Sequence, residues 1–496
     1  MVGSLRTEFI RLFKLTPVKA GWYLSLVPKI TVDGKEINAP DGVNVIEAAK
    51  LAGSSVPHYC YHRKLSVAGN CRICMVEIEK MPKLQIACNT KVQEGMVVKT
   101  KSPKVLEARQ AVLEFILVNH PIDCPVCDQA GECKLQKYYM SHDLKPSRMT
   151  EEKVHKEKAV PLGPYVKLDM ERCILCSRCI RFCDEISKTN ELCFTERGNH
   201  TELTTYPGRE LDNPYSVNTV DLCPVGALTS TDFRFKQRVW FLKSTDSICP
   251  GCSTGCNIKI DHNKGVIYRL KPREKEAVNQ LWMCDEGRLT YKPVNEESRL
   301  RSPYFRSEKS LQIIRMKEAV RRFKELLSGL SPASVVGIGS AEFTNEENKA
   351  LIDCLMAIGV KDFYFHAKEV SNPSQDDFLI SADKNPNRAG VTALGMKPIT
   401  ADRKYQGFVI LGGLPESSIR ALSLERNRKV ILLTSHQRPE YEYADLILPV
   451  ATWAESEGTF TNRQGMVQKI NPAFPPPGEA KQASEIFAEV QKLWKS

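Results

Sequence analysis

The chain has 496 residues, of which 42% are hydrophobic and 26% are charged, so its composition is that of a folded protein with several domains and not of a disordered or fibrous one. Its formal net charge of +11 comes from lysines and arginines scattered among acidic residues, which argues against a nucleic-acid-binding surface. No run reaches the roughly 18 to 20 apolar residues that a membrane-spanning helix needs, so we expect a soluble protein, or a peripheral one held by a partner.

The 18 cysteines stand in tight groups along the chain. A long chain without a convincing secretory segment does not fit the pattern of a small disulphide-rich protein, so we interpret these groups as metal ligands in a reducing compartment. Iron–sulphur clusters require thiolates, which are soft ligands, and two cysteines on one short loop can bind neighbouring positions of one cluster.

The first 28 residues carry four basic residues, Arg6, Arg11, Lys14 and Lys19, against one acidic residue. Apolar residues lie among them, so a targeting peptide is one interpretation. We favour a basic N-terminal arm over residues 1–28 that packs on a partner or presents a basic surface, because the segment is neither serine-rich nor followed by a clear cleavage site.

Two short strand-like runs, residues 29–32 and 35–38, begin the first domain and are joined by an Asp-Gly pair that is typical of a tight hairpin turn. Asn44, followed three residues later by Glu47, predicts a capped helix start. Four cysteines follow, and we expect them to hold a [2Fe–2S] centre. They are Cys60, Cys71, Cys74 and Cys88. A structural zinc site is the alternative, although such sites commonly use two Cys-x2-Cys hooks and this segment has one.

The spacing of these four cysteines departs from the plant-type ferredoxin order, because ten residues separate the first two. It resembles the ferredoxin-like head of the large iron–sulphur subunit of respiratory complex I and of the related subunits of NAD-linked hydrogenases. That resemblance implies a β-grasp fold for this domain.

A helix is predicted over residues 106–118, and the order His-x3-Cys-x2-Cys-x5-Cys follows it. A lone histidine is more often a packing or surface residue than a ligand, but this order resembles the histidine-ligated [4Fe–4S] site of the same subunit family. Exchanging a thiolate for a neutral imidazole should shift the potential of a cluster. The candidate ligands are His120, Cys124, Cys127 and Cys133, and His142 is the alternative histidine.

A charged stretch over residues 143–158 is interpreted as a linker, and the next domain begins near Tyr165. It contains a Cys-x2-Cys-x2-Cys run and, much later, a Cys-Pro pair, which supplies the fourth ligand of such a run in bacterial ferredoxins. The candidate [4Fe–4S] ligands are Cys173, Cys176, Cys179 and Cys223. Cys183 is the competing fourth ligand; otherwise Cys183 and Cys193 are expected to be packing residues.

A fourth set has the order Cys-x2-Cys-x3-Cys-x27-Cys. This order resembles the N-terminal [4Fe–4S] domain of molybdopterin oxidoreductases such as formate dehydrogenase, with zinc as the alternative metal. Its members are Cys249, Cys252, Cys256 and Cys284. Glu286 stands where formate dehydrogenases usually have a lysine, which weakens the case for electron passage to a pterin.

From residue 303 onward the pattern is that of an α/β domain, with an amphipathic helix over residues 318–327. Buried strands are predicted over residues 335–338, 408–411, 430–433 and 446–450. Thr344 with Glu347 predicts a capping box, and Cys354 falls on the apolar face of the helix that follows.

Residues 443–468 resemble the pterin-binding domain of molybdopterin oxidoreductases. The chain is shorter than the full set of pterin domains, and we expect no molybdopterin. Gly337 and Gly339 are only a fragment of a dinucleotide-binding fingerprint, so no nucleotide site is expected either.

Together the motifs resemble a short form of the large iron–sulphur subunit of NADH:quinone oxidoreductase over residues 29–496. The resemblance implies a multidomain α+β chain with one [2Fe–2S] cluster and two to three [4Fe–4S] clusters. The expected domains are a [2Fe–2S] domain (29–105), a [4Fe–4S] domain with one histidine and three cysteine ligands and its linker (106–164), a [4Fe–4S] ferredoxin-type domain (165–245), a molybdopterin-oxidoreductase-type [4Fe–4S] domain (246–302) and a C-terminal α/β domain (303–496).

By this resemblance, the chain passes single electrons from an FMN-bearing, NADH-binding partner toward a quinone-reducing arm, and no side chain acts as an acid or a base. Its partners would be the other subunits of the peripheral arm. The expected location is the cytoplasmic side of a bacterial inner membrane, with an organelle matrix as the other option.

Two further functions share some of these motifs. A diaphorase or electron-transfer subunit of an NAD-linked hydrogenase or formate dehydrogenase would carry the same first three sets. A catalytic iron-hydrogenase chain would need further cysteines after residue 290, where only Cys354 lies.

Overall fold

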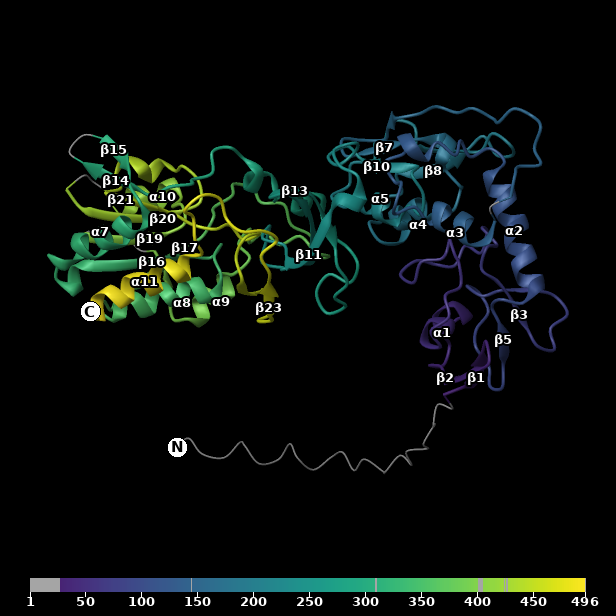
Figure 1. The fold of residues 1–496 in the computed structure, drawn as a ribbon, viewed down its shortest axis with the longest axis horizontal. Coiled ribbons are helices and arrows are strands. Elements are labelled where there is room, and N and C mark those ends of the chain that lie inside the picture. The colour runs from purple at the N-terminus through teal and green to yellow at the C-terminus, as the bar shows by residue number, and fades with distance from the viewer. Residues whose placement is uncertain are drawn as a thin grey trace, which may run out of the picture. The chain divides into compact units, whose positions relative to one another are not determined.

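The computed structural model describes residues 27–143, 145–307, 310–399, 405–422, 424 and 427–495. Except for its last two residues, the basic arm predicted over residues 1–28 lies outside this part of the chain. The described residues form two compact units, whose elements are labelled in Figure 1. One unit holds residues up to 118 together with 138–150, and the other holds residues 119–137 and 151 onward.

The first unit is a five-stranded mixed sheet with helices packed against it. The strands, in the spatial order β2-β1-β5-β3-β4, are β1 (Lys29–Val32), β2 (Lys35–Asn38), β3 (Met75–Ile78), β4 (Gln85–Ile86) and β5 (Val97–Lys99). Its helices are α1 (Val45–Leu51), α2 (Pro103–Leu117) and the second half of α3 (Lys134–His142). β1 pairs parallel with β5, and the other neighbours are antiparallel.

The predicted hairpin and capped helix of this unit are confirmed. β1 and β2 pair from Val32 opposite Lys35, and the turn residues Asp33 and Gly34 both have positive φ, at 51° and 83°, as a tight hairpin turn requires. The Asn44 side chain accepts a hydrogen bond from the backbone of Glu47 and so caps α1. The buried face of α1 packs on the sheet, which makes the core of this unit.

The N-terminal part of the second unit consists of short elements separated by long loops. They are β6 (Val160–Pro161), β7 (Val166–Leu168), α4 (Arg178–Glu185), β8 (Leu192–Thr195), β9 (Glu202–Thr205), α5 (Asn218–Leu222) and β10 (Leu228–Ser230). An antiparallel three-stranded sheet follows, made of β11 (Lys243–Ile248), β12 (Asn257–Asn263) and β13 (Val266–Pro272), and then α6 (Asp285–Arg288). Most cysteines of the sets in this unit lie in loops, where the chain is free to turn toward a metal, and Cys179 lies in the first turn of α4.

The C-terminal part contains an eight-stranded sheet in the order β15-β14-β21-β20-β19-β16-β17-β18. These strands are β14 (Tyr304–Ser307), β15 (Ser310–Ile313), β16 (Val335–Ser340), β17 (Phe363–His366), β18 (Lys397–Pro398), β19 (Gly407–Leu411), β20 (Lys429–Thr434) and β21 (Leu446–Pro449). All neighbouring strands from β21 to β18 are parallel. A separate hairpin is formed by β22 (Gly458–Thr461) and β23 (Val467–Ile470).

Helices cover the large sheet, and its strands separate two cores. The helices are α7 (Met316–Ser328), α8 (Asn345–Met356), α9 (Arg388–Ala393), α10 (Glu416–Ala421) and α11 (Ala483–Lys495). Alternate residues of β19 and β20 belong to different cores: Val409 and Ile431 pack with α7, α8 and α11, whereas Phe408 and Val430 pack on the opposite face. A parallel sheet buried on both faces explains the near-continuous apolar runs from which these strands were predicted, and the α/β domain is confirmed.

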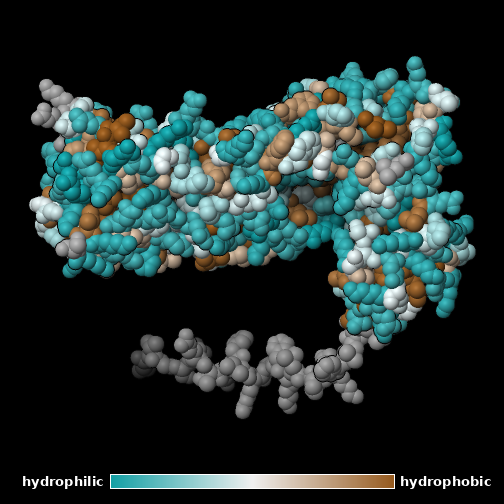
Figure 2. Space-filling view, in the orientation of Figure 1, coloured by the Kyte–Doolittle hydropathy of each residue, from teal (hydrophilic) through white to brown (hydrophobic). Residues whose placement is uncertain are grey.

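The described residues contain no helix that is both long and apolar enough to cross a membrane. The surface visible in Figure 2 is mostly hydrophilic, with apolar residues in small scattered groups.

The capping box of α8 provides a test of the C-terminal fold. Thr344 accepts a hydrogen bond from the backbone of Glu347 and donates one to its buried carboxylate. Thr344→Ala should therefore destabilise α8 by about 1 to 2 kcal/mol and speed its amide exchange by about five- to thirtyfold. Hydrogen exchange read by mass spectrometry on peptides spanning α8 measures this. Thr344→Ser keeps the hydroxyl and is the control; equal exchange in the two variants would contradict the capping role.

Candidate metal centres

The first cysteine set lies within the first unit, in the loops that flank β3 and β4. Cys60 donates its backbone N–H to Cys71 Sγ at 3.4 Å, and Cys74 and Cys88 interact through their thiols. The pKa of Cys71 is raised by the hydrogen bond with the Cys60 thiol and by burial, and that of Cys88 is lowered by the hydrogen bond with the Cys74 thiol. The charge of Cys60 acts on both Cys74 and Cys88, so the structure brings the four predicted side chains together.

The second set lies in the second unit, at a short helical turn over Cys124–Val126. Burial lowers the pKa of His120 to about 4, so its ring is neutral, as a metal ligand must be. Its Nδ1 atom is buried and has no hydrogen-bond partner. Burial raises the pKa of Cys133 to about 11, and the neighbouring charges of Cys127 and Cys124 act in the same direction. The alternative histidine, His142, belongs to the first unit, where its ring lies 6.4 Å from that of Tyr138.

The third set surrounds one cavity. The cavity is lined by Cys173, Cys176, Cys179 and Cys223, together with Ile174, Ser177, Arg178, Phe194, Leu203, Val225, Ala227 and Leu228. Burial raises the pKa of all four thiols, to about 11 for Cys176. Cys183 is fully buried on α4 and is not among the lining residues, while Cys193 lies half-buried on β8.

The fourth set also shares one cavity, which is lined by Cys249, Gly251, Cys252, Cys256, Met283, Cys284, Glu286, Gly287, Ile380 and Lys384. The backbone N–H of Gly251 donates to Cys249 Sγ at 3.4 Å, and that of Gly287 donates to Cys284 Sγ at 3.3 Å. A Cβ atom on Gly287 would lie 3.2 Å from both Cys249 Sγ and Cys284 Sγ, so a side chain here would crowd both sulphurs.

Backbone conformations that are rare outside glycine occur in the cysteine loops. Arg72, between Cys71 and Cys74, has a φ of 58°, and Leu175 and Ser177, on either side of Cys176, have φ values of 53° and 58°. Such residues cost free energy and persist where the surrounding structure requires them, often at functional sites. They turn the chain so that its N–H groups approach sulphur: backbone hydrogen bonds act on Cys173 and Cys176 in this loop. The amino-acid sequence carried no signal for these conformations.

The second and third sets are joined by direct contacts. Lys134, next to Cys133, donates its backbone N–H to the carbonyl of Pro224 at 2.9 Å, and Pro224 follows Cys223. The buried Arg172, next to Cys173, donates from Nε to Asp123 Oδ1 at 2.9 Å, and Asp123 precedes Cys124. These two contacts fix the separation of the two sets.

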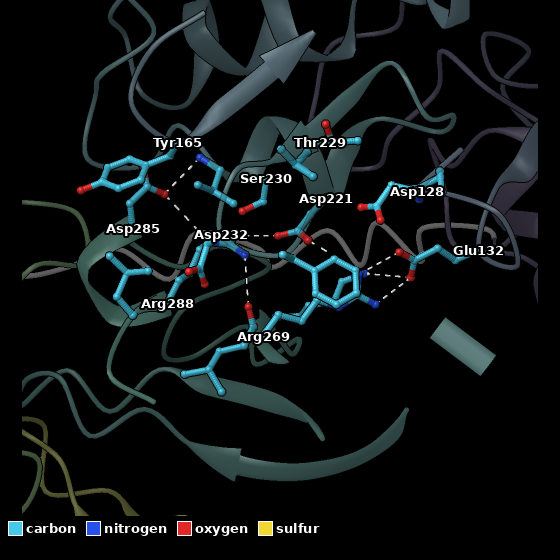
Figure 3. Close-up of a pocket in the computed structure, with 17 residues that line it drawn as sticks. Asp128, Glu132, Tyr165, Asp221, Thr229, Ser230, Asp232, Arg269, Asp285 and Arg288 are labelled. Carbon is cyan, nitrogen blue, oxygen red and sulfur yellow. Dashed lines mark hydrogen bonds and ion pairs between the residues drawn. The ribbon is translucent and has the colours of Figure 1, made fainter. Parts of the chain in front are cut away.

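Ion pairs among four residues that line a pocket extend this connection toward the fourth set; the residues are Glu132, Asp221, Arg269 and Arg288 (Figure 3). Arg269 on β13 donates to both carboxylate oxygens of Glu132 at 2.8 and 2.9 Å, and to Asp261 at 2.7 Å. Arg288, on the helix that begins after Cys284, donates to Asp221 at 2.6 Å, and Asp221 is two residues from Cys223. These residues were not predictable from the sequence, because their partners lie far apart in the chain.

Across the described part of the chain, no group of three or more histidine, cysteine, aspartate or glutamate side chains is arranged to hold a single metal ion. That result concerns a single ion, whereas the ligands of an iron–sulphur cluster are spread over several iron atoms. The donor chemistry fits such a group: soft thiols converge in each set, one set adds an unpaired histidine nitrogen, and glycines leave room beside the sulphurs.

Family models match most of the chain. They are a 2Fe-2S iron-sulfur cluster binding domain (29–103), the NADH-ubiquinone oxidoreductase-G iron-sulfur binding region (109–148), the ferredoxin-like domain of NADH-quinone oxidoreductase subunit 3 (163–229), the molybdopterin oxidoreductase Fe4S4 domain (242–296) and molybdopterin oxidoreductase (416–493). The chain is therefore a multidomain α+β protein with [2Fe–2S], [4Fe–4S] and molybdopterin-oxidoreductase-type domains, as predicted.

Curated relatives confirm the predicted resemblance. The NADH-quinone oxidoreductase G subunit of Rickettsia conorii is 39% identical over 335 residues, which is 68% of this chain and 50% of the relative. NADH dehydrogenase [ubiquinone] iron-sulfur protein 1 of Solanum tuberosum mitochondria is 39% identical over 68% of this chain and 46% of its own length. The chain thus spans about half the length of these relatives. A solved NAD+-reducing [NiFe]-hydrogenase is 29% identical, with a TM-score of 0.39, over 43% of this chain and 91% of its own.

A substitution at Gly226 tests whether Cys127 binds iron. A Cβ at this position would lie 2.3 Å from Cys127 Sγ and 3.2 Å from the Cβ of Gln129. A free cysteine would rotate away, but a cysteine bound to iron would lose its bond. Gly226→Ala should therefore lower the iron and acid-labile sulphide retained by purified protein. Gly329→Ala is the control, because nothing lies within 4 Å of its added Cβ. Unchanged iron content in Gly226→Ala would contradict the assignment of Cys127.

Proposed function

The chain is a homologue of the NADH-quinone oxidoreductase G subunit over 68% of its length, and we propose that it is the electron-relay subunit of an NADH:quinone oxidoreductase. The observation that carries this proposal is the convergence of its cysteines, most of them buried, into four sets, each within the residues that a matching family model covers. No acid, base or nucleophile is needed for a relay.

The proposed ligands follow the four sets. They are Cys60, Cys71, Cys74 and Cys88 for a [2Fe–2S] cluster, and His120, Cys124, Cys127 and Cys133, then Cys173, Cys176, Cys179 and Cys223, then Cys249, Cys252, Cys256 and Cys284 for [4Fe–4S] clusters. When bound, these clusters would accept and release single electrons. The matched family models support both kinds of cluster, and the shared cavity supports Cys223 over Cys183 as the fourth ligand of the third set.

The proposed domains keep the predicted boundaries, 29–105, 106–164, 165–245, 246–302 and 303–496. A β-grasp fold for the first is supported by its mixed sheet, in which the N-terminal hairpin pairs parallel with β5 and α1 packs against it. The C-terminal domain would keep the fold of a pterin domain without a pterin.

The residues around the clusters would control water access, the separation of the clusters and their reduction potentials. They bury most of the ligands, which limits contact with water, and they hold the second and third sets at a fixed separation through the Lys134–Pro224 and Arg172–Asp123 contacts. Backbone N–H groups aimed at sulphur, such as those of Gly251 and Gly287, favour the thiolate form and tune potential.

We propose that electrons arrive from an FMN-bearing, NADH-binding subunit beside the [2Fe–2S] domain and leave toward a quinone-reducing arm. In this proposal the second and third sets, which direct contacts join, lie on the path, and the fourth set lies off it, as the family resemblance implies. The protein would work in the peripheral arm on the cytoplasmic side of a bacterial membrane.

A substitution at Cys176 tests whether the third set lies on the electron path. Cys176→Ala should remove one tetranuclear signal from the low-temperature EPR spectrum of the reduced complex and stop NADH-driven quinone reduction. Cys183→Ala is the matched control, because this cysteine is buried on α4 but does not line the cavity. Unchanged turnover in Cys176→Ala would take the third set off the path, and loss of the signal in Cys183→Ala would make Cys183 the fourth ligand.

A further inference from the structure

A lysine from the C-terminal domain lies in the wall of the fourth cysteine site. Lys384 lines the same cavity as the four cysteines, although it stands 98 residues after Glu286. Its side chain is only 4% exposed. Lysine is almost never fully buried unless its charge is paired, so a partner must offset this ammonium group.

Glu286 is that partner. Lys384 Nζ donates to Glu286 Oε2 at 2.8 Å and to Ser374 Oγ at 2.8 Å, and the Ser374 hydroxyl donates to the same carboxylate oxygen at 2.9 Å. The Glu286 side chain is 53% exposed, so water screens the carboxylate, whereas the ammonium is enclosed. The positive charge is therefore screened less than the negative one.

Hydrogen bonds on the segment that carries Lys384 fix its position. Ser253, in the loop between Cys252 and Cys256, donates its backbone N–H to the carbonyl of Asp383 at 2.8 Å. The hydroxyls of Ser253 and Ser381 are 2.8 Å apart, and the Thr254 hydroxyl donates to the carbonyl of Leu379 at 2.7 Å. The cysteine loop and the lysine segment are thus tied together.

We propose that Lys384 sets the reduction potential of the cluster at the fourth site, by holding a buried positive charge beside a group that gains one electron. The inference rests on the proposed function in one respect, that these four cysteines hold a cluster. A fixed cation stabilises the form that carries the extra negative charge and so raises the potential. Glu286 acts in the opposite direction and moderates the effect.

A redox titration of the assembled complex, followed by low-temperature EPR, tests this. Lys384→Met should shift the oxidised-to-reduced ratio of one tetranuclear signal at least tenfold toward oxidised at a fixed potential, which is 59 mV for a one-electron couple. Glu286→Gln should shift the same signal toward reduced, and Lys384→Arg should stay near the unmodified protein. Lys349→Met, at an exposed position on α8, is the control and should leave every signal in place.

Lys384→Met and Glu286→Gln should shift the potential in opposite directions, so the two variants together distinguish an effect of charge from an effect of altered structure. If Lys384→Met loses the cluster, the shift in Glu286→Gln decides: a shift toward reduced supports the proposal, and no shift overturns it. Equal potentials in all variants would overturn this inference while leaving the ligand assignment intact. If the unmodified complex has no signal from the fourth site, then both the fourth ligand set and the role of Lys384 are wrong.

Discussion

Burial of the cysteine thiols is the constraint on which the rest of the structure depends. Burial raises the pKa to about 11 for Cys133 and Cys176 and to about 12 for Cys284, so free thiols here stay protonated at neutral pH. A thiolate in these surroundings costs free energy unless positive charge offsets it, and a metal that binds thiolate supplies that charge. Because such binding is coupled to folding, the stability of these domains includes the free energy of cluster binding.

The same constraint explains how the fold is divided. Sheets and long helices lie where apolar residues pack, while most of the candidate ligand cysteines occupy short loops, one of which has the left-handed residues Leu175 and Ser177. In regular strands the backbone N–H groups donate to carbonyl oxygens of the neighbouring strand, whereas these loops leave some N–H groups free to approach sulphur. Partly buried ion pairs, among them Arg172–Asp123 and Arg269–Glu132, then join segments that secondary structure does not connect.

Features encoded locally were predictable from the sequence. The hairpin of β1 and β2, the caps at Asn44 and Thr344, and the buried strands of the large sheet follow from turn residues, capping pairs and apolar runs. The spacing of the cysteines predicted the four sets, and the members of the third and fourth sets each line one cavity. The roles of Lys384, of Gly226 and of the ion pairs made by Arg269 and Arg288 were not predictable. Each of these residues acts on a site that is far away in the chain. Their roles arise only when tertiary packing brings those segments together.

The central claim is that the thiols of this chain hold iron–sulphur clusters, and metal analysis tests it most directly. Iron, acid-labile sulphide and zinc would be assayed together on the full chain, purified without oxygen. The account predicts iron and sulphide in near-equal amounts with little zinc, since both kinds of cluster contain one sulphide for each iron. Zinc bound to the cysteines without sulphide would contradict the account and make these sites structural.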